Sequence, residues 1–289
     1  MTLSEISTLI YNGLIYFVLA FLIFFIGKKI YQLIHHDISL KDELVVKDNL
    51  AFTLSHLGYL SGLLIIIGGS IIGPSEGLVN DIINILSYGL LGIILLNLSI
   101  IISDKIILRH FSIKKEVIED KNVGVGVIEG AISIGSGLII FGAISGEGYS
   151  LLHGIISTLI FWAIGQVVLI ITTRVYNMIT SYNIHKHLEE DNFAVGIGYA
   201  GALIAISIII KFGISGVFDD WTDVVFEAGV EILIGLLLLP LMRYLTDKIL
   251  LPGANLTEEI INQEKPNIGA SLIEGFAYIG GAILLTWCL

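Results

Sequence analysis

The chain has 289 residues, of which 55% are hydrophobic and only 14% are charged. Soluble domains carry about 25% charged residues, so this composition argues against a water-soluble globular protein and predicts a surface that faces lipid. The formal net charge is −11 and the chain has no basic tract, which argues against a nucleic-acid partner.

Eight stretches of the sequence approach the roughly 20 apolar residues that a helix needs to cross a bilayer. In chain order they lie near 9–33, 50–72, 80–104, 122–145, 151–178, 193–215, 222–247 and 267–288. Their apolar runs are continuous, whereas the strands of a membrane β-barrel alternate apolar and polar residues. The sequence therefore predicts an all-α integral membrane protein with eight transmembrane helices.

Lysine and arginine are distributed unevenly among the connections between these stretches. They flank the first, third, fifth and seventh connections, and the second, fourth and sixth contain none. Lys211, near the end of the sixth stretch, is the exception. Because cytoplasmic loops carry the excess of basic residues, we expect the longer connections in the cytoplasm and both termini on the extracytoplasmic side.

An asparagine ends a charged linker and begins a Gly-rich apolar stretch at four places. These are Asn49, Asn122, Asn192 and Asn267, which recur at nearly equal spacing along the chain. As N-caps, their side chains would accept hydrogen bonds from backbone N–H groups that hydrocarbon cannot satisfy. Each repeat crosses the membrane twice, so successive repeats start from the same side and are related in parallel.

A larger period, of about half the chain, groups the repeats in pairs. Lys29-Ile30-Tyr31 recurs as Arg174-Val175-Tyr176, and Ser103-Asp104-Lys105 recurs as Thr246-Asp247-Lys248. We therefore expect two homologous four-helix halves, residues 1–145 and 146–289, related by a pseudo-two-fold axis along the membrane normal.

The asparagine entrances also carry a resemblance to a known family. Asp48-Asn49-Leu50-Ala51 and Asp191-Asn192-Phe193-Ala194, with four-helix units, acidic linkers and Gly-rich alternate helices, resemble the YjfL-like bacterial membrane family, a domain of unknown function. The resemblance covers nearly the whole chain as two tandem copies, although Lys121 and Pro266 depart from the motif. It implies a multi-pass protein of the bacterial cytoplasmic membrane and brings no established activity.

The first candidate site residues lie seven positions past each asparagine, about 10 Å into the helix. They are His56, Glu129, Tyr199 and Glu274. A carboxyl inside a membrane costs on the order of 3 kcal/mol unless it is paired, protonated or hydrated. If Glu129 and Glu274 face the pseudo-axis, they would repel and could share a proton or bind a cation. Alternatively, each hydrogen-bonds a neighbouring helix or the linker, and both interpretations stay open.

Glu227 and Glu231 form a second candidate set, because their spacing of four places them on one face of the seventh helix. Glu231 is expected near mid-membrane. Lys211 either neutralises Glu227 or extends outward to the interface. The pair is then either structural or an ion or proton path that opens to the outside.

Histidines cluster beside acidic residues in two linkers, at His35-His36-Asp37 and at His185-Lys186-His187. Such groups could bind a divalent metal, but they are more commonly solvated loop charge. We predict no metal site and no cofactor.

Three classes of function are consistent with these residues. The favoured hypothesis is a cation or proton channel or transporter that uses the carboxyls within its helices. The alternative is a structural or signalling membrane component that docks cytoplasmic partners through its acidic linkers. An intramembrane enzyme is the third and is not expected, because the sequence contains no metalloprotease, serine-hydrolase or P-loop motif. The lipid bilayer is the one required partner; a homo-oligomer and a cytoplasmic protein partner stay open.

Overall fold

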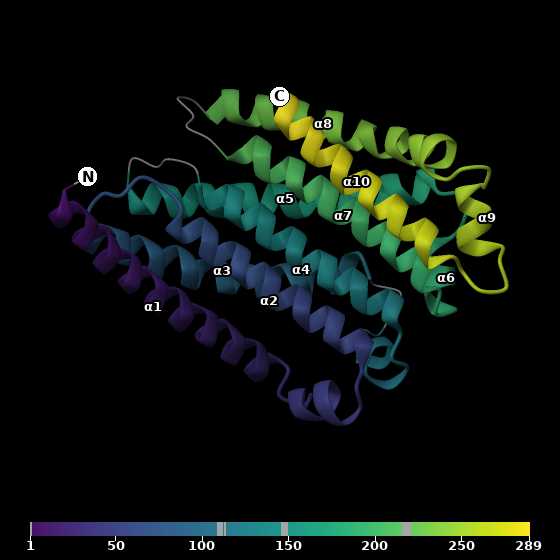
Figure 1. The fold of residues 1–289 in the computed structure, drawn as a ribbon, viewed down its shortest axis with the longest axis horizontal. Coiled ribbons are helices and arrows are strands. Elements are labelled where there is room, and N and C mark those ends of the chain that lie inside the picture. Colours follow the sequence, from purple (N-terminus) through teal and green to yellow (C-terminus); the bar gives the residue numbers. More distant parts are fainter. Residues whose placement is uncertain (1, 109–111, 113, 146–149, 216–220) are drawn as a thin grey trace.

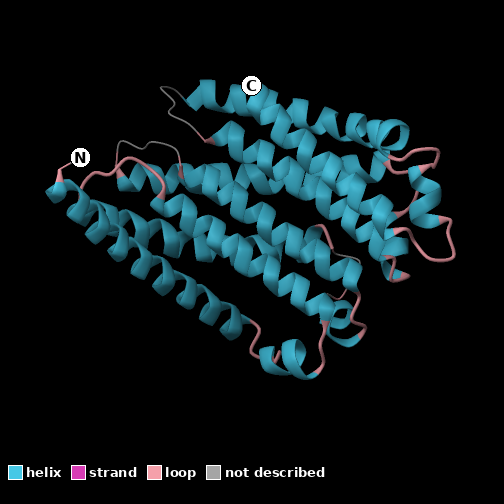
Figure 2. Cartoon of the chain, in the orientation of Figure 1, coloured by secondary structure: helices cyan, strands magenta, loops and turns pink. Residues whose placement is uncertain are grey.

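The computed structural model describes residues 2–108, 112, 114–145, 150–215 and 221–289. Within these ranges, eight helices are long and apolar enough to cross a membrane. They are α1 (Leu3–Ile34), α2 (Leu50–Ile71), α3 (Leu78–Ile106), α4 (Val123–Ile144), α5 (Leu151–Ile179), α7 (Phe193–Ile214), α8 (Trp221–Leu245) and α10 (Ile268–Cys288). Helices and loops make up the described part of the chain (Figure 2). The predicted all-helical membrane fold is confirmed.

Short helices form the linkers between the spanning helices. They are η1 (Asp42–Val46), η2 (Lys114–Glu119), α6 (Ile184–Glu189) and α9 (Leu256–Ile261), and η3 (Thr246–Leu250) continues α8. The linkers gather at one end of the bundle, which we call the linker end, while the two chain termini lie toward the other, the terminal end (Figure 1). Parts of the third, fourth and sixth connections, namely 109–111, 113, 146–149 and 216–220, lie outside the described residues.

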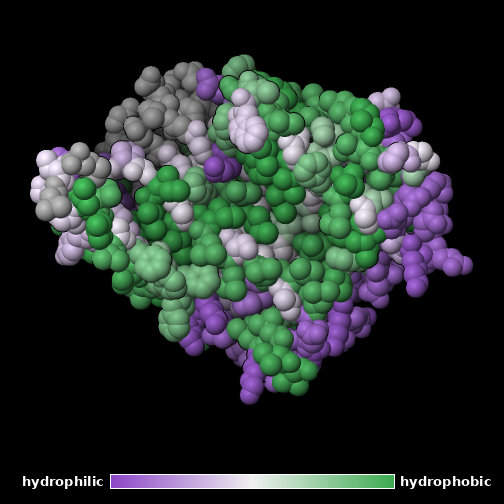
Figure 3. Space-filling model, viewed as in Figure 1, coloured by the Kyte–Doolittle hydropathy of each residue, from purple (hydrophilic) through white to green (hydrophobic). Residues whose placement is uncertain are grey.

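Four spanning helices form an inner row in the order α2, α4, α7, α10, in which each packs against the next. All four begin at an asparagine at the linker end, so they run parallel to one another. The other four spanning helices run in the opposite direction and pack against this row: α1 and α3 on α2, α5 on α4 and α7, and α8 on α7 and α10. Hydrophobic surface covers the spanning helices, and hydrophilic residues gather at the linker end (Figure 3).

Glycines allow the parallel helices of the inner row to approach very closely. A Cβ added at Gly58 of α2 would lie 2.1 Å from the Cα of Gly130 in α4. A Cβ added at Gly201 of α7 would lie 2.5 Å from the Cα of Gly275 in α10. These distances are too short for any side chain, so the contacts require glycine.

The asparagines that begin the inner helices also join successive linkers. Each accepts a hydrogen bond through Oδ1 from the backbone N–H three residues later. Through Nδ2, the first three donate to a carbonyl of the next linker: Asn49 to Val117 at 2.8 Å, Asn122 to Leu188 at 2.6 Å and Asn192 to Ile260 at 3.0 Å. We call this arrangement the asparagine ladder. Asn267 instead donates to the carboxylate of Glu259, in the linker that precedes it, at 2.7 Å.

The residue before each of the first three asparagines has a left-handed backbone. The φ angles are 46° at Asp48, 54° at Lys121 and 57° at Asp191. The proline ring fixes φ at a negative value, so Pro266 cannot adopt this conformation. The fourth linker therefore reaches its helix by a different path, which accounts for the departure of its sequence from the motif.

Candidate functional site

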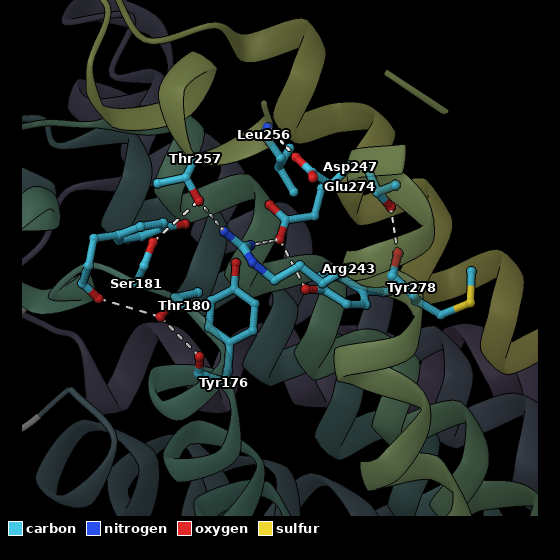
Figure 4. A network of polar contacts seen from close by, with 12 residues as sticks. Tyr176, Thr180, Ser181, Arg243, Asp247, Leu256, Thr257, Glu274 and Tyr278 are labelled. Atoms are coloured by element: carbon cyan, nitrogen blue, oxygen red, sulfur yellow. Dashed lines mark hydrogen bonds and ion pairs between the residues drawn. The ribbon is translucent and has the colours of Figure 1, made fainter. Parts of the chain in front are cut away.

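The carboxyl of Glu274 lies inside the second set of four spanning helices, where its side chain is fully buried. Arg243 of α8 donates from Nη1 to Oε1 of Glu274, and the Tyr278 hydroxyl donates to the same oxygen at 3.0 Å. Nη2 of Arg243 donates to Thr257 Oγ1 at 3.2 Å (Figure 4). A buried carboxylate therefore has a fixed counter-charge, which offsets the cost of its burial.

Tyrosines surround this ion pair. Tyr176 of α5 stacks on Tyr199 of α7 at 5.2 Å and meets Tyr278 edge to face at 6.0 Å between ring centroids. The guanidinium carbon of Arg243 lies 5.7 Å from the ring centroid of Tyr182, in cation–π range. Burial and the nearby Glu274 carboxylate raise the pKa of Tyr182 to about 12, so its phenol stays neutral.

Glu129 of α4 occupies a different environment. It lines a cavity of about 190 Å³ whose walls come from α1, α2, α3, α4 and the adjoining linkers. Asp104 of α3 lines the same cavity and interacts electrostatically with Glu129, and Ser55 of α2 is a hydrogen-bonding neighbour of that carboxyl. Tyr31 and Tyr59 add aromatic walls, with ring centroids 4.5 Å apart. Glu129 has no ion pair within the described ranges.

The cation at the mouth of this cavity is already engaged. Lys114 of η2 lines the cavity at the linker end but forms an ion pair with Asp37. The hydrogen bond from Lys114 holds the pKa of Asp37 below its usual range, and Asp37 raises the pKa of Lys114. The ammonium is therefore held at the surface, and the two carboxyls inside have no ion-pair partner among the residues that the structure describes.

Alignment of the sequence at the asparagine entrances explains why a cavity lies beside Glu129 and side chains fill the equivalent space beside Glu274. Aligning the first asparagine entrance with the third pairs Ile100 with Arg243. Aligning the second entrance with the fourth pairs Ser133 with Tyr278. Ile100 and Ser133 both line the cavity. The smaller side chains leave open the space that an arginine and a tyrosine fill beside Glu274.

The structure does not bring Glu129 and Glu274 into one site. The cavity at Glu129 is lined by residues 31–133 only, whereas the hydrogen-bond partners of Glu274 are Arg243 and Tyr278. Of the two interpretations left open by the sequence, a shared site on a common axis is therefore not the arrangement found here, and each carboxyl has its own surroundings. The physical reason is that α7 stands between α4 and α10 in the inner row.

His56 and Tyr199 are the other two candidate residues seven positions past an asparagine. Each packs beside a tyrosine of a neighbouring helix, and these two tyrosines occupy equivalent positions in the sequence. His56 is 4% exposed and its ring centroid lies 4.8 Å from that of Tyr31. Tyr199 stacks on Tyr176 and donates to Thr173 Oγ1 at 2.7 Å. Both support the tyrosine of a neighbouring helix and neither lines the cavity.

Glu227 and Glu231 lie closer to the terminal end, on α8. Glu231 precedes Arg243 by twelve residues, or about 18 Å of helix. Its Oε2 is buried without a hydrogen bond in the described part of the chain and lies against Gly213 of α7. Glu227 is exposed. Lys211 lies over the Phe141 ring at 4.4 Å and forms no ion pair with Glu227 within the described ranges, so the predicted neutralising pair is not formed.

A second cavity, of about 480 Å³, opens at the terminal end of α1, α2 and α3. Asp81 lies in it and accepts hydrogen bonds from the Tyr16 hydroxyl at 2.5 Å, the Ser75 hydroxyl at 2.5 Å and the Glu76 N–H at 3.0 Å. Along α2, α3 and α4, fully buried aliphatic side chains fall between the residues that line one cavity and those that line the other: Leu63, Ile66, Ile93, Leu96 and Ile140. We call this group the aliphatic plug.

The histidine clusters are dispersed into separate contacts. His35 stacks on Tyr31 at 4.2 Å, and Nδ1 of His187 lies 3.2 Å from Glu190 Oε2. Among the residues that the structure describes, no three His, Cys, Asp or Glu side chains are grouped so that they could hold a metal ion.

Sequence reasoning missed the parts of the two sites that distinguish them. Arg243 was interpreted only as an indicator of topology, and Tyr31 and Asp104 only as markers of the repeat. The signal that could have found them is the alignment of the first asparagine entrance with the third, which places Arg243 opposite Ile100.

Comparison with known proteins gives three findings. The family model described as Domain of Unknown Function (DUF350) matches the chain twice, at residues 4–144 and 150–289. A UPF0719 transmembrane protein of Aquifex aeolicus (strain VF5) is 24% identical over 260 residues, which cover 87% of this chain and 90% of that protein. No solved structure matches the chain.

Proposed function

The chain belongs to the DUF350 family of membrane proteins, and from the geometry around Glu129 we propose that it moves protons or a small cation across the bilayer. The observation that carries the proposal is the cavity that Glu129 and Asp104 share, in which neither carboxyl forms an ion pair with a described residue. Two ionised carboxyls confined in such a space would repel each other. A proton or a cation between them removes that repulsion, and the site is therefore suited to take up positive charge.

The positions of the two cavities support a path through the first four helices. One opens toward the linker end and the other toward the terminal end. Along α2, Tyr59 lines the first and Gly69 lines the second. These residues are ten positions apart, or about 15 Å. The aliphatic plug between them closes the path in this conformation, so the proposed transport requires α1 or α3 to shift relative to the inner row.

The second four helices have a supporting role in this proposal. Glu274 is buried against Arg243 and Tyr278, as the structural alternative requires of a carboxyl. Glycine contacts join α4 to α7 and α7 to α10, so in this proposal the second half holds the inner row in place while α1 or α3 moves. We therefore assign transport to the first half and scaffolding to the second.

A flux assay on reconstituted full-length protein tests the proposed function. Liposomes loaded with a pH-sensitive or cation-sensitive dye are expected to show flux with the natural chain. The flux should be lost in Glu129→Gln and strongly reduced in Asp104→Asn. Glu227→Gln is the matched control, because this carboxyl is exposed and lies outside the cavity; its flux should be unchanged. Unchanged flux in the Glu129→Gln, Asp104→Asn double variant would refute the proposal, as would natural protein that conducts nothing.

We further propose that the protein lies in the bacterial cytoplasmic membrane with its linker end in the cytoplasm, as the distribution of lysine and arginine favours. Cys288, the single cysteine, is exposed at the end of α10. A membrane-impermeant maleimide added to intact spheroplasts should label it. Labelling only after the membrane is permeabilised would reverse the orientation.

A further inference from the structure

We propose that the site at Glu129 binds a planar organic monocation of the guanidinium class. Arg243 would then be a covalently attached counterpart of this ligand in the second half of the chain. The inference rests on the proposed function, since it names the substrate class of the same site. It also depends on the volume of the cavity and on the side chains that line it.

The contacts of Arg243 show how this scaffold holds a guanidinium. The group donates to the Glu274 carboxylate and to the Thr257 hydroxyl, and its carbon lies over the Tyr182 ring. Tyr176 lies alongside, with its ring edge to face against that of Tyr278 at 6.0 Å between centroids. Carboxylate, hydroxyl and aromatic faces are thus combined around one cation, which is the usual chemistry of a guanidinium site.

The cavity at Glu129 also combines a carboxyl, hydroxyls and aromatic rings, and it lacks the arginine. Its hydroxyls and rings come from other positions than Thr257 and Tyr182. Glu129 is the carboxyl aligned with Glu274, and Tyr31 is the ring aligned with Tyr176. The hydroxyls of Ser55 and Ser133 line the cavity, and Tyr59 adds a second aromatic wall. Because Ile100 stands at the position aligned with Arg243, no arginine is among the described residues that line the cavity.

The size of the cavity favours an organic cation over a bare metal ion. Its volume of about 190 Å³ equals the share of roughly six liquid waters. A bare alkali ion would be far too small to touch opposite walls. A planar group of several heavy atoms can reach the carboxylate with two parallel N–H donors and still stack on a tyrosine ring.

The two carboxyls are expected to act unequally on this ligand. In the second half, Asp247 is aligned with Asp104, yet Asp247 accepts from the Leu256 N–H and pairs with Lys248 at the linker. Of these two carboxyls, only Glu274 accepts a hydrogen bond from the guanidinium in the described contacts. By the same arrangement, Glu129 is the direct partner of the bound cation and Asp104 adds longer-range attraction.

Calorimetric titration of the purified full-length protein in detergent tests this inference, with methylguanidinium chloride as the probe and sodium, potassium and tetramethylammonium chlorides as comparisons. Methylguanidinium should bind saturably and at least about tenfold more tightly than the others, and Glu129→Gln should abolish the binding. A tenfold difference corresponds to about 1.4 kcal/mol.

Two variants copy the second site into the first. Ile100→Arg supplies the tethered guanidinium, and Ser133→Tyr fills the cavity without adding charge; each should remove methylguanidinium binding. Ile106→Arg is the matched control, because it adds the same charge to the same helix at a position that is 43% exposed. It should leave binding intact. If either cavity-filling variant folds and still binds methylguanidinium normally, the inference is wrong.

The flux assay separates failure of this inference from failure of the proposed function. Proton or alkali-ion flux that depends on Glu129 but is indifferent to methylguanidinium would overturn the substrate class and leave the transport proposal standing. Saturable methylguanidinium binding by a protein that shows no flux would support the site and refute transport.

Discussion

The guanidinium of Arg243 and the carboxylate of Glu274 form an ion pair between α8 and α10, 31 residues apart in the chain and shielded from water. Removing one member of such a pair leaves the other as an uncompensated buried charge, whereas removing both leaves a neutral interior.

Arg243→Met is therefore expected to lower the free energy of unfolding by about 3–5 kcal/mol. The double variant with Glu274→Gln should recover most of that loss. Lys248→Met is the control, because Lys248 is more than half exposed where it pairs with Asp247 and should contribute at most about 1 kcal/mol. Reversible unfolding in mixed detergent micelles measures all three; equal losses in the single and double variants would contradict the assignment.

The glycine contacts of the inner row predict that adding a single methyl group at one of them lowers the stability of the protein. In Gly58→Ala the new Cβ would meet the Cα of Gly130 at 2.1 Å, so α2 and α4 must separate. We expect a loss of about 1–3 kcal/mol. Gly13→Ala, in the exposed first half of α1, meets nothing within 4 Å and should cause no loss. Thermal unfolding compares the two, and equal stability would argue against close helix packing as the determinant.

The hydrogen bonds of the asparagine ladder predict that an Asn→Asp substitution destabilises the protein by different amounts at different asparagines. Asn→Asp keeps the oxygen that caps the helix but replaces the Nδ2 donor by a second acceptor. At Asn49 that donor serves both the Val117 carbonyl and the Glu43 carboxylate, whereas at Asn192 it serves the Ile260 carbonyl.

Asn49→Asp should therefore destabilise the protein by about 1–2 kcal/mol more than Asn192→Asp, because it places two carboxylates in contact. Asn183→Asp, at an exposed cap that makes no such donation in the described contacts, should change stability by less than about 0.5 kcal/mol. Denaturation midpoints would decide the order. A larger loss of stability at Asn192 would show that the contact between Asn49 and the Glu43 carboxylate does not contribute to stability.

Glu43 predicts a dependence of stability on pH. Burial raises the pKa of this carboxyl, but hydrogen bonds from Lys47 at 2.5 Å and Asn49 at 2.9 Å outweigh it and hold the pKa below its ordinary value. A depressed native pKa means that the stabilising contribution is complete above the unfolded value of about 4.3 and is lost as the pH falls through the native value.

Melting temperatures of the natural chain and Glu43→Gln should therefore differ at neutral pH and converge in acid. Glu116→Gln provides the comparison, since Glu116 accepts a longer contact of 3.2 Å from Asn122 and should show a smaller difference at neutral pH. If the difference in melting temperature between the natural chain and Glu43→Gln stays constant from neutral pH to about pH 3, the role assigned to Glu43 is contradicted.

Much of the fold follows from local properties of the sequence. Eight apolar runs of sufficient length predict eight helices, and the asparagines mark where four of them begin. The first helix starts at Leu3 rather than near residue 9, because Thr2 and Glu5 form a capping box around a polar first turn. That signature was in the sequence, but a count of apolar residues does not detect it.

The arrangement of the site depends on contacts that sequence periodicity does not specify. The common depth of Glu129 and Glu274 follows from their distance to an asparagine. That distance does not determine which helix faces each carboxyl. Every spanning helix is apolar on most of its surface, and helix association in lipid depends on detailed packing. The pairing of Arg243 with Glu274 and the open space beside Ile100 therefore required the structure.

The parallel inner row also constrains the order in which the chain can be assembled. Neighbours in the row begin far apart in the sequence, at Asn49, Asn122, Asn192 and Asn267, and a helix of opposite direction separates them in the chain. Each contact must therefore wait until the next helical hairpin has been synthesised and inserted. Until α7 arrives, the face of α4 that carries Gly124 and Gly142 is open to lipid or to another nascent chain, so the halfway stage of biosynthesis is the one most exposed to mispairing.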